Sequence, residues 1–96
     1  MEIYQNLQLN KKICDLKPHD KNIDIKIMVI QQMIKNQRCS NGEFRLYQFL
    51  VSDNTGSILC NFYDEWGEKI KEGDILVLRC AYVSIYKSQM ILYTSR

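Results

Sequence analysis

Hydrophobic and polar residues alternate most clearly around an Asp-Asn-Thr-Gly turn at residues 53–56. After the turn, Ile58, Cys60 and Phe62 fall on one face of a predicted strand, and Tyr63 falls on the other. Apolar residues also precede the turn, which predicts a β-hairpin whose short loop uses its glycine at positive φ. The three-residue face is expected to point into the core. Tyr63 is then either a surface anchor or a lid over a second, smaller core.

The same alternation predicts further strands and one helix. The expected strands cover residues 22–34, 44–51, 57–63, 75–85 and 89–94. The first strand is long and rich in β-branched residues, so it has to bend to keep both ends on a core. Residues 35–43 are polar and end in an Asn-Gly signal, which predicts a loop closed by a turn. Residues 64–70 predict a short helix, with Asp64 as its cap and Trp66 one turn from Ile70 on one face.

The order of these elements predicts an all-β fold. Five strands with one short helix between strands 3 and 4 are typical of an OB-fold barrel, a small barrel whose closure removes exposed sheet edges. Trp66 and Ile70 are expected to plug the bottom of the barrel beneath the helix. The OB-fold domain is predicted at residues 13–96, preceded by a polar N-terminal arm at residues 1–12.

Composition narrows the functional classes only slightly. The 96 residues are enough for one small domain. The formal net charge of +2 is too weak to imply a polyanionic partner by itself, so any basic patch has to come from local arrangement. No apolar run is long enough to span a membrane, and the first residues do not match a signal peptide.

Neither metal binding nor catalysis is supported by the residues present. The cysteines, which form no Cys-x-x-Cys pair, are Cys14, Cys39, Cys60 and Cys80. Because the only histidine is His19, we expect no metal site, no cofactor and reduced cysteines buried as small hydrophobes. The chain also lacks a Gly-rich phosphate loop, so no catalytic residue is assigned and the protein is not expected to be an enzyme.

Aromatic residues carry the strongest functional signal. Six tyrosines are present, four of them from position 63 onward. In an OB barrel, the middle strands and the loops after strands 1 and 4 form the groove that holds nucleic acid. Aromatic rings beside positive charge suit a single strand, because bases stack on rings while phosphates follow charge. The candidate nucleic-acid-binding residues are Tyr63, Tyr82, Tyr86 and Tyr93, with Lys87, Arg45, Lys35 and Arg38 within reach. Plain packing of tyrosines at the barrel rim is the alternative.

Four segments also carry a family resemblance. They are Asp-Asn-Thr-Gly-Ser-Ile at 53–58, Gly-Asp-Ile at 73–75, Ala-Tyr-Val-Ser-Ile-Tyr-Lys at 81–87 and Leu-Tyr-Thr-Ser-Arg at 92–96. Together they resemble the simple single-OB-domain SSB family, in particular the single-stranded DNA-binding subunit of the sensor-of-single-stranded-DNA (SOSS) complex. The first segment is shared by many OB domains, whereas the Tyr-x-Ser-x-aromatic-Lys stretch is more particular.

The resemblance implies single-stranded DNA binding in DNA repair and genome maintenance, and a nuclear location. It implies that the tyrosines at positions 63, 82, 86 and 93 stack bases. Larger protein subunits of a multi-protein complex are the partners expected besides single-stranded DNA, and RNA stays open as a second ligand. The alternative function is that of a small OB-fold scaffold subunit of a replication or telomere complex, acting mainly through protein–protein contacts.

Overall fold

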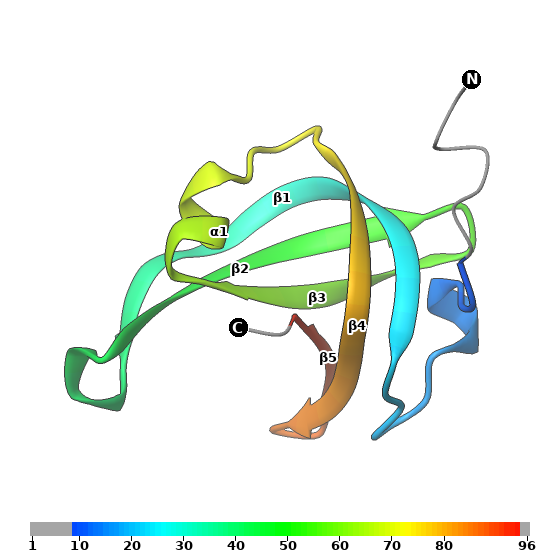
Figure 1. The fold of residues 1–96 in the computed structure, drawn as a ribbon, viewed down its shortest axis with the longest axis horizontal. Coiled ribbons are helices and arrows are strands. Elements are labelled where there is room, and N and C mark those ends of the chain that lie inside the picture. Colours follow the sequence, from blue (N-terminus) through cyan, green and yellow to red (C-terminus); the bar gives the residue numbers. More distant parts are fainter. Residues whose placement is uncertain (1–8, 95–96) are drawn as a thin grey trace.

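The computed structural model describes residues 9–94, whose strands close into a barrel in the order β1-β2-β3-β5-β4. The elements are η2 (Ile13–Asp15), β1 (Ile23–Cys39), η3 (Ser40–Gly42), β2 (Phe44–Asp53), β3 (Gly56–Tyr63), α1 (Asp64–Lys69), β4 (Ile75–Tyr86) and β5 (Gln89–Tyr93) (Figure 1). Strands β3 and β5 pair in parallel, and the other neighbours pair antiparallel. This arrangement confirms the predicted barrel with one short helix after the third strand.

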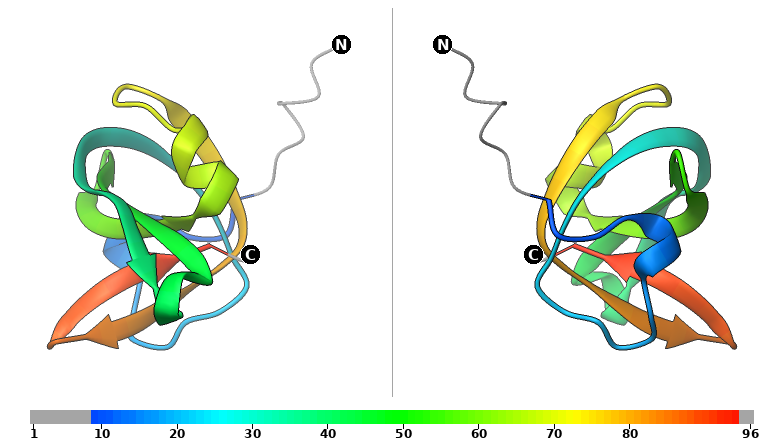
Figure 2. Two further views of the ribbon diagram at one scale, coloured as in Figure 1. Left: turned by 90° about the vertical axis from the view of Figure 1, so that its left-hand side faces the viewer. Right: turned by 90° about the vertical axis from the view of Figure 1, so that its right-hand side faces the viewer.

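The two ends of the barrel carry different elements. In Figure 2, α1 and the β1–β2 hairpin face the viewer on the left, and η2 faces the viewer on the right. Residues 1–8 of the predicted N-terminal arm lie outside the described residues. Within residues 9–94, no helix is long and apolar enough to cross a membrane, and no group of three or more His, Cys, Asp or Glu side chains is placed to hold a metal ion.

The core face of the central strands was predicted correctly. Ile58, Cys60 and Phe62 are buried inside the barrel. Phe62 packs edge-on against Phe49 of β2, with ring centroids 5.9 Å apart. Burial raises the pKa of the Cys60 thiol, so this cysteine behaves as a small hydrophobe.

Strand β1 is longer and less regular than predicted. It bends through three register shifts against β2 and continues to Cys39, which pairs with Phe44. The loop predicted at 35–43 is therefore wrong for its first five residues, which belong to a two-stranded ribbon with solvent on both sides. Such a ribbon has no hydrophobic alternation to predict it from. The Asn-Gly turn is confirmed, with Asn41 at φ 60° and Gly42 at φ 90°.

A bulge in β4 overturns the predicted burial of Cys80. Leu78 and Ala81 are both buried although they are three residues apart, and the register against β1 shifts between them. The extra residue leaves Cys80 exposed at φ 55°, with its N–H donating to Asp24 Oδ1 at 3.1 Å.

The same correction applies to two other cysteines. Cys14 is exposed and Cys39 is only partly buried, so the buried position expected for all four holds for Cys60 alone.

The predicted plug beneath α1 is also wrong. Trp66 is 67% exposed, and Ile70 alone of the predicted pair packs against the core. The ring that fills this end belongs to Tyr47 of β2, which is 4% exposed. Gly67 lies directly over it, and a Cβ at Gly67 would overlap the Tyr47 ring. Gly67 thus makes the close contact with Tyr47, and its neighbour Trp66 points to solvent instead.

Asp64 does not cap the helix as predicted. Its Oδ1 accepts the backbone N–H of Arg45 at 3.0 Å, and its own backbone has φ 52°. Among residues 9–94, no side chain caps the start of α1. The carboxylate therefore ties the helix to β2 instead of stabilising its first turn.

We expect Gly67→Ala to destabilise the protein, although alanine favours a helix. Overpacking against Tyr47 should cost about 1–3 kcal/mol, more than the gain of about 1 kcal/mol in helix propensity. Trp66→Ala is the control and should change the free energy of unfolding by less than about 0.5 kcal/mol. Urea denaturation of both variants measures this. A Gly67→Ala variant more stable than the parent would show that the close packing on Tyr47 is absent.

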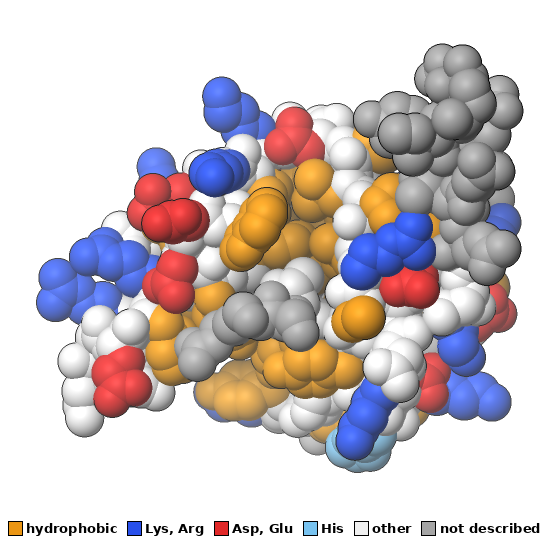
Figure 3. Space-filling model, viewed as in Figure 1, with side chains coloured by type: hydrophobic (Ala, Val, Ile, Leu, Met, Phe, Trp, Pro, Cys, Tyr) orange, Lys and Arg blue, Asp and Glu red, His pale blue; other side chains and the backbone are white. Residues whose placement is uncertain are grey.

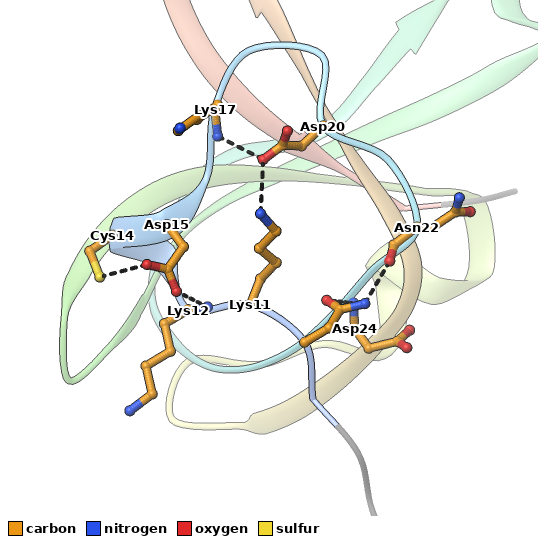
Figure 4. A network of polar contacts seen from close by, with 9 residues as sticks. Lys11, Lys12, Cys14, Asp15, Lys17, Asp20, Asn22 and Asp24 are labelled. Carbon is orange, nitrogen blue, oxygen red and sulfur yellow. Dashed lines mark hydrogen bonds and ion pairs between the residues drawn. The ribbon is translucent and has the colours of Figure 1, made fainter.

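Residues before β1 are bound to the barrel at the opposite end. The Asn10 side chain donates to the carbonyl of Asn22 and accepts the N–H of Asp24, at 2.9 and 3.0 Å. Lys11 forms an ion pair with Asp20 at 3.7 Å (Figure 4). These contacts close the segment that leads from residue 10 into β1.

The turn between β2 and β3 anchors η2. Asp53 Oδ1 accepts from Thr55 N, Thr55 Oγ1 and Gly56 N, and its Oδ2 accepts from Ile13 N at 2.8 Å. Thr55 Oγ1 in turn accepts the N–H of Cys14 at 3.0 Å. The predicted turn is confirmed, but Gly56 is not among the residues at positive φ, because it already belongs to β3.

Candidate nucleic-acid interface

One outer face of the barrel runs in register across four strands. Gln48 of β2 pairs with Asn61 of β3, Asn61 with Tyr93 of β5, and Tyr93 with Tyr82 of β4. Directly opposed residues share a face, so these side chains form one row outside the barrel. We call the outer surface that carries Tyr63, Tyr82, Tyr86 and Tyr93 the tyrosine face.

The centre of the tyrosine face is a stacked pair of rings. Tyr82 and Tyr93 lie parallel, with centroids 5.2 Å apart and an angle of 9° between the ring planes. Tyr82 is 40% exposed, whereas Tyr93 is partly buried. Burial raises the pKa of the Tyr93 phenol, and the neighbouring Tyr82 and Tyr86 add to the shift. The Tyr93 ring is therefore neutral at physiological pH, and Tyr82 presents an accessible ring surface beside it.

Tyr63 continues this face at the end of β3. Its ring meets Phe44 edge-on, with centroids 5.4 Å apart and planes at 85°. Burial raises the pKa of the Tyr63 phenol, and a hydrogen bond with the Asn61 side chain partly opposes the shift. Tyr63 is thus both a surface ring and part of a small cluster outside the core. Phe44 was not predicted to belong here, because only the register of β2 against β3 brings it to Tyr63.

A polar pair lies beneath the rings. Asn61 is 5% exposed, and its Oδ1 accepts a hydrogen bond from Gln48 Nε2 at 2.9 Å. Its backbone carbonyl accepts from Thr94 Oγ1 at 3.3 Å. Asn61 lies on the outer face of β3, as Tyr63 does, and neighbours from β2 and β5 bury it there. The pair offers fixed hydrogen-bonding groups in the floor of the face.

The turn between β4 and β5 places a cation beside an aromatic ring. Lys87 and Ser88 have φ of 51° and 65°, which makes the connection as tight as predicted. Lys87 Nζ lies 5.3 Å from the centre of the Tyr86 ring, and Tyr86 is 57% exposed. Positive φ at both central residues is the geometry of a two-residue hairpin turn. Tyr86 pairs with Gln89 in the same register as the rest of the face.

The predicted arginines lie elsewhere. Arg38 and Arg45 are direct cross-strand partners in the β1–β2 hairpin. The neighbouring pair of Cys39 and Phe44 belongs to the tyrosine face, so the arginines point to the opposite side of the hairpin. Lys35 is exposed on β1 close to an irregular stretch of the pairing. The structure thus groups the four tyrosines with Lys87 and separates Arg38 and Arg45 from them.

Aliphatic residues extend the face towards the β4–β5 turn. Ile91 is 3% exposed although it is not part of the barrel core, because its side chain lies on the outer face in register with Leu59. A hollow of about 840 Å³ adjoins it, with Met33, Leu50 and Met90 in its lining. In Figure 3, hydrophobic side chains gather between α1 and β4 and around the end of β5, and basic side chains lie near α1 and the hairpin.

A closed five-stranded barrel with a helix after its third strand defines an OB-fold domain. The family model described as "Single-stranded DNA binding protein Ssb-like, OB fold" matches residues 16–96, so the chain belongs to this family. The predicted membership of the SSB family is confirmed at this level.

The known proteins similar to the chain include a single-stranded DNA binding protein and a protein of known structure. The single-stranded DNA binding protein Ssb of Saccharolobus solfataricus is 24% identical over 85 residues, which cover 88% of this chain and 57% of that protein. The chain therefore spans little more than half the length of this relative. The solution structure of a hypothetical protein from Arabidopsis thaliana has a TM-score of 0.73 at 20% identity, covering 96% of this chain and 71% of that one. At this identity, the second likeness shows the fold alone.

Proposed function

We propose that the protein binds single-stranded DNA on the tyrosine face. The observation that carries the proposal is the stacked pair of Tyr82 and Tyr93, aligned in register with the strand that ends in Tyr63. A base stacks on the exposed side of Tyr82, because its other side is already covered by Tyr93. Tyr86 provides a second exposed ring, and Lys87 beside it meets the phosphate between the two bases. The family of the chain supports this function.

The biological setting belongs to the same proposal. We infer that the protein acts in DNA repair and genome maintenance in the nucleus, within a complex of the SOSS type that includes larger protein subunits. The segments at 81–87 and 92–96 support this setting through their resemblance to the DNA-binding subunit of that complex. RNA can occupy the same rings, because stacking does not distinguish the two sugars.

A scaffold function is the second candidate, and one surface favours it. Met28 and Ile75 are paired across β1 and β4 and are 42% and 59% exposed. With Leu9 and Lys26 they line a hollow of about 570 Å³ away from the tyrosine face. Exposed apolar side chains around a hollow are typical of protein-binding surfaces. A scaffold would use this surface and leave the tyrosines as packing.

Lys87→Ala tests the phosphate contact by its salt dependence. We expect the slope of log affinity for labelled oligo-dT against log salt to fall by about 0.7, as for one lost contact on a single strand. Lys26→Ala removes an equal charge from the other hollow and should leave the slope unchanged. Fluorescence anisotropy at several salt concentrations measures both. A parent chain that melts cooperatively yet binds no oligo-dT would refute DNA binding and favour the scaffold.

A further inference from the structure

The back of the β1–β2 hairpin carries two arginines that form no ion pair with the described residues. Arg38 and Arg45 are directly opposite one another, and both are exposed. Like charges in such positions repel each other and destabilise the pairing. The ion pairs found within residues 9–94 are Lys11–Asp20 and Arg79–Asp24, and neither includes these arginines. The two guanidinium groups therefore remain able to bind an anion.

The position of this pair connects it to the tyrosine face. The hairpin projects past the end of the barrel (Figure 1). Phe44, in contact with Tyr63, lies on one side of the hairpin, and the arginines lie on the other. Arg45 Nη1 donates to Asn36 Oδ1 at 2.8 Å, which holds the guanidinium on this back side. A single-stranded nucleic acid that leaves the tyrosine face past Phe44 therefore has only to pass around the two-stranded hairpin to reach the arginines.

Helix α1 adds an aromatic ring near the same side. The hydrogen bond from Arg45 N to Asp64 Oδ1 joins the start of α1 to the hairpin and occupies that carboxylate. Two residues on, Trp66 is 67% exposed, with Lys69 Nζ 5.7 Å from the centre of its ring. An open indole beside a cation is a strong platform for a nucleobase. The exposed Trp66 side chain has no packing role in the barrel core.

We propose that Arg38, Arg45 and Trp66 form a second contact surface for single-stranded nucleic acid, used by strands longer than the tyrosine face can hold. The two guanidinium groups bind a phosphate between them, which removes their mutual repulsion. Trp66 then stacks a base beyond that phosphate. This proposal rests on the proposed function, since the strand reaches the back of the hairpin from the tyrosine face.

The experiment uses Trp66 as its own reporter, because it is the only tryptophan in the chain. Tryptophan emission and anisotropy are followed with oligo-dT of about 6 and about 14 nucleotides, within the range of single OB-fold sites. We expect the long oligonucleotide to quench Trp66 and the short one to leave it unchanged. The double variant Arg38→Gln/Arg45→Gln should bind the long oligonucleotide about tenfold more weakly, with parent-like affinity for the short one. Lys71→Gln, which removes one exposed charge on another turn, is the control for a general effect of lost charge and should leave both affinities unchanged.

The outcomes separate the two proposals. If both oligonucleotides bind with equal affinity and neither quenches Trp66, the second surface is refuted and the tyrosine face stands. If the arginine variant weakens only the long oligonucleotide but Trp66 stays unquenched, the phosphate site is supported and the stacking role of Trp66 is wrong. If the parent binds neither oligonucleotide, the proposed function fails, and this extension fails with it.

Discussion

Asp53→Ala is expected to lower the free energy of unfolding by about 3 kcal/mol or more. One carboxylate accepts hydrogen bonds from Ile13, Thr55 and Gly56, and thereby joins the β2–β3 turn to η2. A hydrogen bond to a charged group contributes about 1.5–3 kcal/mol, and the N–H groups left behind lose their partner. This loss is a large share of the free energy of unfolding of a small domain, which is roughly 5–15 kcal/mol. Urea denaturation measures it.

The pH dependence of an isosteric variant, Asp53→Asn, checks the cause. Burial alone would raise the pKa of Asp53, but its hydrogen bonds outweigh burial and hold the pKa below the ordinary value of 3.8. Because the pKa of Asp53 is lower in the folded than in the unfolded protein, the ionised carboxylate stabilises the fold. This stabilisation is complete above pH 3.8 and is lost as the pH falls through the pKa of the folded protein. The stability difference between the parent and Asp53→Asn should therefore shrink in acid.

Asn54→Ala is the control for this prediction, because Asn54 is exposed in the same turn. It should change the free energy of unfolding by less than about 0.5 kcal/mol. An Asp53→Ala variant as stable as Asn54→Ala would mean that η2 is not held by the carboxylate. A stability gap that stays constant down to the acid transition would mean that the ionised form is not what matters.

Period-two alternation predicted the parts of this protein that depend on local geometry. It placed Ile58, Cys60 and Phe62 inside the barrel because strands there are regular. The groove expected for an OB barrel brought Tyr82 and Tyr93 together, and the structure stacks their rings. Binding by these rings stays a prediction until it is measured.

The errors arise where tertiary contacts override the local pattern. One extra residue in β4 turns Cys80 outward, and nothing in the apolar run around it marks the bulge. At α1, Gly67 approaches Tyr47 closely, so the large residue that looked like the plug points to solvent. The sequence pattern does not show whether Trp66 or Gly67 faces the ring of Tyr47, which lies about twenty residues earlier in the chain.

The candidate site shows the same division. The tyrosines could be found from parity and composition, since each lies on a regular strand or at its end. The separation of Arg38 and Arg45 from them depends on the register of the β1–β2 ribbon, which three shifts have altered. Phe44 and Gln48 join the face only through their cross-strand partners. Residues that join the site only through their cross-strand partners therefore cannot be identified from the sequence pattern.

The double variant Tyr82→Ala/Tyr93→Ala is expected to lose about 2–4 kcal/mol of affinity for oligo-dT, or roughly 30- to 1000-fold. Removing one stacking ring costs about 1–3 kcal/mol. The slope of log affinity against log salt should stay close to that of the parent, because neither ring contacts a phosphate by charge. Anisotropy titrations at several salt concentrations measure both quantities. Thermal melts run alongside, because Tyr93 is partly buried and its loss also affects stability.

The geometry of the pair makes the two losses non-additive. Because the rings are parallel at 5.2 Å, a base cannot enter between them and has to stack on the exposed side of Tyr82. Tyr93 acts by holding Tyr82 in place, so Tyr93→Ala should weaken binding even though its ring touches no base. The double variant should then lose less than the sum of the single variants. Strict additivity would mean that each ring stacks its own base.

Tyr82→Phe is the matched control, since it keeps the ring and removes the hydroxyl. It should bind oligo-dT within about twofold of the parent, because stacking uses the face of the ring. A Phe variant as weak as Tyr82→Ala would point to a hydrogen bond from the hydroxyl instead of stacking. Parent-like affinity in a stably folded double alanine variant would remove the tyrosine face as the binding site. The second contact surface of Arg38, Arg45 and Trp66 would lose its support as well, because single-stranded DNA is proposed to reach it from the tyrosine face.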